Sequence, residues 1–174
     1  MKRYHPALVS LHWLLTFMIV VALFMGSNIL SQIPNDNPEK LLALKAHMIT
    51  GFIILTLMIA RLIVRNVTEK PPLADAGNAL LNKAGVMAHY LLYLLIFAMV
   101  GSGIATALIS GLPDIVFNSS GVALPEDFND ILPRIFHGVI AKILFAMIAL
   151  HILASLYHQF VRKDHLLSRM WFGK

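Results

Sequence analysis

The sequence contains no cysteine among its 174 residues. This absence excludes disulfide bonds, thiolate nucleophiles, cysteine-ligated iron–sulfur clusters and covalent haem attachment through C-x-x-C-H. Charge is scarce as well, because only 13% of the residues are charged and 58% are hydrophobic. With a mean hydropathy of +0.75, this composition excludes an ordinary soluble domain and predicts a membrane protein. The sequence also lacks internal repeats and the glycine motifs that bind dinucleotides or phosphates.

Four apolar runs of about 20 residues are each long enough to cross a bilayer. They cover residues 9–30, 44–64, 85–109 and 136–161, and polar connections separate them. We therefore predict an all-α integral membrane four-helix bundle in which residues 1–174 form a single domain. The basic start followed by Leu14–Met25 also resembles a secretory signal peptide, but the apolar run is long for a signal.

The basic residues are distributed unevenly between the two ends of these spans. Ten of the fourteen lie in or beside the two termini and the second connection: Lys2, Arg3, Arg61, Arg65, Lys70, Lys83, Arg162, Lys163, Arg169 and Lys174. The other four lie near the first and third connections, beside six of the nine acidic residues. The positive-inside rule therefore predicts that both termini are cytoplasmic. Topology and anionic lipid explain the basic character, so we expect no nucleic-acid partner.

Four histidines lie at matched depths inside the spans: His12 and His151 near the cytoplasmic end, and His47 and His137 near the outer end. His137 and His151 are fourteen residues apart, which places them about 21 Å apart along the helix axis and within about 40° of one face. This geometry predicts two metal centres across the membrane, one held by His47 with His137 and one by His12 with His151. Hydrogen bonding to a neighbouring helix is the alternative for any one of them. Bis-histidine ligation without cysteine or intramembrane carboxylate favours haem b iron over zinc.

Glycine and arginine positions agree with this interpretation. Gly51 lies one turn from His47, and Gly138 adjoins His137, so a flat macrocycle could approach the backbone there. Arg61 lies near the cytoplasmic end, where it could pair with a haem propionate. It could instead extend to the lipid surface as part of the positive-inside signal.

Two further histidines are ambiguous. His158 lies seven residues beyond His151 on the same stripe, and His89 approaches from the third span. Either could replace a cytoplasmic-side ligand, but ligation by His158 would separate the two centres by about 31 Å, which exceeds the hydrocarbon thickness. We therefore predict that His89 and His158 line a polar pocket near the cytoplasmic surface, where imidazoles can bind quinone oxygens and carry protons.

Several motifs recur in order along nearly the whole chain: SLHW, KAHMITG followed by ARLIVR, MAHYLLY, and FHG followed by ALHILASLYHQFVRKD. Together they resemble the bacterial cytochrome b561 family. The resemblance implies a four-helix, two-haem b protein of the bacterial cytoplasmic (inner) membrane, with His12, His47, His137 and His151 as haem ligands and a quinone site near the inner haem. The shorter members include superoxide oxidase, which passes electrons from superoxide to ubiquinone. The same core occurs in cytochrome b subunits of hydrogenases and formate dehydrogenases.

A donor site for superoxide, a small anion, would require positive charge near the outer haem. Lys45, Arg134 and Lys142 lie near that depth, although Lys142 could extend outward to the lipid surface. The family resemblance, to which these residues lend local support, implies a superoxide:ubiquinone oxidoreductase. A haem-bearing subunit that relays electrons between the quinone pool and a partner oxidoreductase remains an alternative, as does a non-redox helical membrane protein. The lack of a large soluble extension favours the enzyme over the relay subunit.

Overall fold

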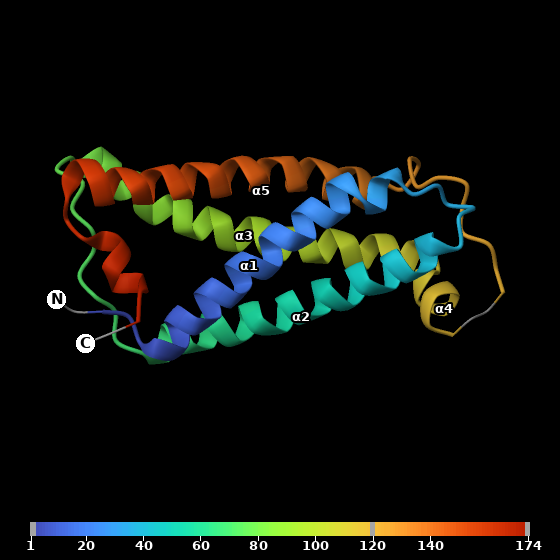
Figure 1. The fold of residues 1–174 in the computed structure, drawn as a ribbon, viewed down its shortest axis with the longest axis horizontal. Coiled ribbons are helices and arrows are strands. Elements are labelled where there is room, and N and C mark those ends of the chain that lie inside the picture. The colour runs from blue at the N-terminus through green and yellow to red at the C-terminus, as the bar shows by residue number, and fades with distance from the viewer. Residues whose placement is uncertain (1–2, 119–120, 173–174) are drawn as a thin grey trace.

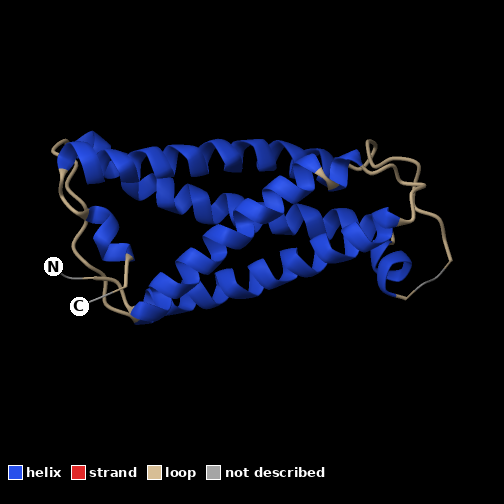
Figure 2. Cartoon of the chain, viewed as in Figure 1, coloured by secondary structure: helices blue, strands red, loops and turns tan. Residues whose placement is uncertain are grey.

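The computed structural model describes residues 3–118 and 121–172. Lys2 and Lys174, which contribute to the predicted charge asymmetry, lie outside these ranges. The described chain contains helices and loops and no strand (Figure 2). The main helices are α1 (Pro6–Asn28), α2 (Glu39–Val67), α3 (Ala79–Ile109), α4 (Leu112–Phe117) and α5 (Leu132–Tyr157).

The predicted all-α membrane fold is confirmed. Four helical segments are long and apolar enough to cross a membrane: Pro6–Gln32, Glu39–Val67, Ala79–Ile109 and Leu132–Arg162. Each predicted span lies inside one of these segments. Large apolar side chains are exposed along all four, as expected for helices whose outer surfaces face lipid.

Local sequence explains where the helices begin and end. The side chain of Asn78 accepts hydrogen bonds from the backbone N–H groups of Leu80 and Leu81, so α3 begins six residues before the span that hydropathy predicts. Gly111 has a φ of 64°, which only glycine adopts without strain, and it separates α3 from α4. The short helix α4 lies in the third connection, a polar segment for which no helix was predicted.

The four spans form two antiparallel pairs, α1 with α2 and α3 with α5 (Figure 1). The backbones of the two helices in each pair lie close together over much of their length, whereas the backbones of different pairs approach each other at few places. Side chains therefore fill most of the space between the two pairs. Six buried residues from all four helices make the central core: Leu15, Ile19, Ile54, Met58, Leu95 and Leu144. A smaller cluster packs beneath α4.

Both termini lie at one end of the bundle, together with the connection between α2 and α3 (Figure 1). We call this the terminal end and the opposite end, with the other two connections, the loop end. The indole N–H of Trp13 donates to the backbone oxygen of Met170 at 2.7 Å. The backbone N–H of Tyr4 donates to the backbone oxygen of Arg169 at 3.2 Å. The Arg169 guanidinium also donates to the backbone oxygen of Pro72 at 2.7 Å. The carboxyl-terminal segment is thereby tied across the terminal end.

Candidate functional site

Two histidines from different helix pairs meet near the loop end. The rings of His47 on α2 and His137 on α5 have centroids 6.1 Å apart. The Nδ1 of His137 lies 2.9 Å from the backbone oxygen of Met99 and 3.1 Å from the hydroxyl of Ser102. Because a carbonyl oxygen can only accept, Nδ1 carries the proton, and the lone pair is on Nε2. A backbone acceptor behind the ring is the usual support for a metal-ligating histidine.

Two glycines lie against these rings, and the approach is tighter at Gly103 than at Gly26. A Cβ atom on Gly103 would lie 3.1 Å from Cε1 of His137, and one on Gly26 would lie 3.4 Å from Cε1 of His47. Neither glycine was among the residues predicted from the sequence. The one feature of the sequence that could have indicated them is their position inside spanning helices. Glycine does not stabilise a helix, and in a spanning helix it usually marks a place where a neighbouring helix approaches closely.

The glycines that the sequence analysis selected have other surroundings. A Cβ atom on Gly51 would meet no atom within 4 Å, so space is open beside this turn of α2. A Cβ atom on Gly138 would lie 3.3 Å from a guanidinium nitrogen of Arg134. Gly138 therefore makes room for an arginine in this structure.

Three histidines meet near the terminal end. The rings of His12 on α1 and His151 on α5 have centroids 6.4 Å apart, and His89 on α3 lies on His151 with a centroid distance of 5.3 Å. The Nδ1 of His89 donates to the backbone oxygen of Gly85 at 2.7 Å. The structure therefore brings His151 together with its predicted partner His12 and also with His89, for which the sequence predicted a polar pocket.

Arg61 lies beside this cluster. One guanidinium nitrogen donates to the hydroxyl of Tyr93, and another lies 3.4 Å from Nδ1 of His12. The remaining nitrogen, Nε, is buried and has no hydrogen-bond partner in the described part of the chain. A buried, unpaired N–H of a cation requires an acceptor, and an anionic group at this position would provide one.

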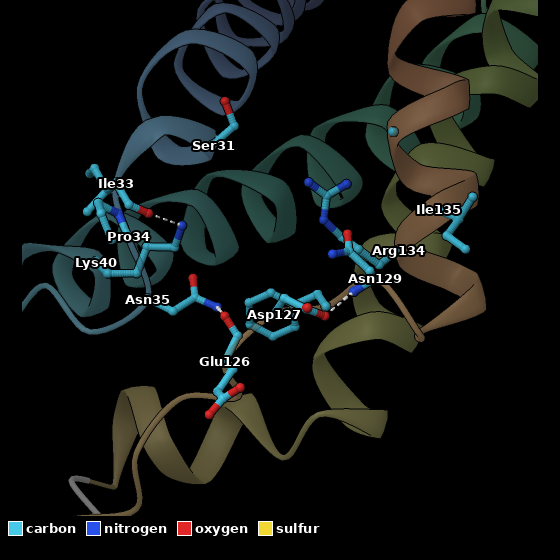
Figure 3. Close-up of a pocket in the computed structure, with 12 residues that line it drawn as sticks. Ser31, Ile33, Pro34, Asn35, Lys40, Glu126, Asp127, Asn129, Arg134 and Ile135 are labelled. Carbon is cyan, nitrogen blue, oxygen red and sulfur yellow. Dashed lines mark hydrogen bonds between the residues drawn. The ribbon is translucent and has the colours of Figure 1, made fainter.

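At the loop end, two cations line an open pocket of about 390 Å³ between the first and third connections (Figure 3). Lys40 is only 7% exposed, and its ammonium donates to the backbone oxygens of Leu30 and Ile33 at 2.8 and 2.7 Å. Arg134 lies in the first turn of α5, three residues before His137. The carboxylate residues Glu126 and Asp127 also line the pocket, so its positive charge is local to Lys40 and Arg134.

The other two predicted cations lie elsewhere. Lys45 is exposed, with its ammonium 5.5 Å from the ring centre of Phe117. Lys142 is exposed on α5 and five residues after His137, so it lies about 140° around the helix from it. Of the three predicted basic residues, the structure brings only Arg134 to the pocket. Lys40 was missed, because its position in the first turn of α2 does not indicate that it bonds back onto the preceding turn.

His158 is separate from the histidine cluster in its contacts. Its Nδ1 lies 2.5 Å from a carboxylate oxygen of Asp164, and its ring neighbour is Tyr157. No direct contact links it to His89 in the described structure.

The sequence matches the family model of prokaryotic cytochrome b561 over residues 3–173. The chain belongs to this family. It is 28% identical over 172 residues to cytochrome b561 homolog 1 of Escherichia coli (strain K12), covering 98% of this chain and 97% of that protein. It is 27% identical over 175 residues to "probable superoxide oxidase CybB" of Yersinia pestis, covering 97% and 96%. The predicted family resemblance is confirmed.

Membership of the cytochrome b561 family implies haem b binding and electron transport, and the described residues fit such a group. Imidazoles on opposite sides of one iron, each with a metal–nitrogen bond of about 2 Å, have ring centres roughly 6 Å apart. The centroid distances of 6.1 Å for His47 with His137 and 6.4 Å for His12 with His151 match this value. The 5.3 Å between His89 and His151 is shorter than axial ligation requires.

Proposed function

We propose that this chain is a two-haem b oxidoreductase that passes electrons from superoxide at the loop end to ubiquinone at the terminal end. The observation that carries the proposal is the presence of two histidine pairs with axial-ligand spacing, each built from two helices. The charge asymmetry supports a bacterial inner-membrane protein with the terminal end in the cytoplasm. The relative named probable superoxide oxidase supports the donor.

The two histidine pairs would hold two haem irons at different depths. His137 and His151 are fourteen residues apart on α5, which corresponds to about 21 Å along the axis. When bound, the two haems would supply one-electron redox chemistry at both depths. The carbonyl of Met99 orients His137 as a ligand, and the unpaired Nε of Arg61 is suited to a propionate beside His12.

The loop-end pocket favours a small anion. Arg134 and Lys40 give it local positive charge, and the two backbone oxygens hold the Lys40 ammonium in place. Local positive charge raises the concentration of an anionic substrate beside it. Lys45 and Lys142 contribute only to the wider field at this end.

At the terminal end the acceptor requires protons as well as electrons. Two superoxide anions give two electrons and become two molecules of oxygen, and ubiquinone takes up these electrons and two protons to become ubiquinol. Imidazoles exchange protons readily near neutral pH, and His89 and His158 lie at this end. We propose that they bind the quinone and supply its protons.

The first test is haem content. The purified protein should bind two haems; His137→Ala should lose the loop-end haem only, and His151→Ala the other haem only, because each removes one axial ligand. Quantitative absorption spectra with redox titration distinguish the two losses. A folded protein without a Soret band, or equal loss of both haems in both variants, contradicts the proposal.

The second test is the donor. In stopped-flow mixing with superoxide, Arg134→Gln should slow haem reduction several-fold, and more at low salt than at high salt. Lys83→Gln is the matched control, since it removes the same charge from the terminal end. An equal effect of Lys142→Gln would place the donor on the exposed face of α5. Failure of superoxide to reduce the wild-type protein would favour the relay subunit.

A further inference from the structure

The last span ends in a chain reversal that places Asp164 on His158. A π-helical turn, His158–Arg162, follows α5, and Lys163 then adopts a left-handed conformation with a φ of 55°. The backbone N–H groups of Lys163 and Asp164 both donate to the backbone oxygen of His158. The side chains repeat the link, with Oδ2 of Asp164 2.5 Å from Nδ1 of His158.

The chain reversal has an unfavourable conformational and electrostatic free energy for a segment that only ends a helix. Lys163 and His165, on either side of Asp164, are the only non-glycine residues with positive φ in the described chain. Glycine usually occupies such positions, because it has no Cβ atom to be strained there. A carboxylate at a helix carboxyl terminus also opposes the helix dipole. Local strain of this kind is typical of functional positions.

The surroundings keep the Asp164 carboxylate charged and in one orientation. The side chains of His158 and Asp164 are 13% and 29% exposed. Partial burial acts to raise the pKa of Asp164, but the hydrogen bonds from His158 and from the backbone N–H of Leu166 lower it below its ordinary value. Arg162 adds positive charge nearby, and Tyr157 is the ring neighbour of His158.

We propose that Asp164 is a positioning residue that holds the proton of His158 on Nδ1 and so makes Nε2 the nitrogen that passes protons to the quinone. This inference rests on the proposed function. Protonated His158 gives its Nε2 proton to a quinone oxygen as the quinone takes up an electron, takes another from solvent, and transfers that one with the second electron. Both electrons originate from two superoxide anions. Throughout these steps, Asp164 accepts a hydrogen bond from the Nδ1 proton, which stays on His158. Its carboxylate stabilises the imidazolium, as a buried carboxylate does in a histidine–aspartate pair.

The test uses the haem-loaded protein with ¹⁵N-labelled histidine and a short-chain ubiquinone. Asp164→Asn should favour the opposite tautomer, because the amide can donate to Nδ1, and Asp164→Glu should partly restore the Nδ1 proton. In Asp164→Asn, haem reoxidation by quinone should slow about tenfold at and above neutral pH, because general acid catalysis by His158 is weakened. The slowing should be smaller in acid. Reduction by superoxide should not change. Asp75→Asn is the matched control, because Asp75 is an exposed carboxylate at the same end, and its hydrogen bonds in the described part of the chain are to Asn82 and Gly77.

An unchanged His158 tautomer in Asp164→Asn would overturn the inference. So would an equal loss of rate at every pH accompanied by a lower melting temperature, which identifies a structural cap. If the wild-type protein shows the Nδ1 proton but does not reduce quinone, the proposed function fails and this proton path fails with it, while the hydrogen bond stands.

Discussion

Gly103→Ala should weaken binding of the haem at the loop end. The new methyl group would lie 3.1 Å from Cε1 and 3.4 Å from Nδ1 of His137. The ring cannot move away freely, because Nδ1 is bonded to the backbone oxygen of Met99 at 2.9 Å. His137 must therefore shift by a few tenths of an ångström while that hydrogen bond resists.

The magnitude follows from two contributions. Overpacking a well-filled site costs about 1–3 kcal/mol, and turning a side chain about 30° from its rotamer costs roughly 0.5–1.5 kcal/mol. Because the required shift is small, we expect about 1–2 kcal/mol, which corresponds to a roughly 5- to 30-fold weaker affinity for haem at this site.

The assay is titration of the haem-free protein with haem, with the two sites distinguished by their redox midpoints. Gly26→Ala is the matched control, because its Cβ atom would lie 3.4 Å from Cε1 of His47, an ordinary contact. We expect a change of less than twofold there. Equal effects of the two variants, or normal haem affinity in Gly103→Ala, would refute the reasoning.

Two further predictions concern the terminal end. Trp13→Phe keeps an aromatic ring, although a smaller one, and removes the hydrogen bond to Met170, so it should destabilise the carboxyl-terminal segment by about 1 kcal/mol. Limited proteolysis should then cleave this segment faster, whereas unchanged cleavage would mean that other contacts hold it. The folded-state pKa of Asp164 lies below its unfolded value, so its contribution to stability is complete well above about pH 4 and is lost as the pH falls through the folded value. Melting temperatures between about pH 6 and pH 3 should therefore fall more steeply in the wild type than in Asp164→Asn, and parallel curves would contradict this.

Hydropathy and helical periodicity are local properties, and the sequence alone determined what depends on them. A membrane leaves only helices or closed barrels for an apolar run, so four runs of suitable length specified four spanning helices. The spacing of His137 and His151 determined their separation along α5, because the rise per residue of a helix is nearly constant. The order of histidine motifs also identified the family.

Contacts between helices depend on the rotation and tilt of each helix, which packing decides and a single sequence does not show. The tertiary structure therefore decided that His12 and His89 both reach His151, and that Gly26 and Gly103 support the loop-end histidines. Lys142 has the right depth but lies on the wrong side of α5. Asp164 meets His158 only because the chain reverses through left-handed residues, and no helical spacing predicts that reversal.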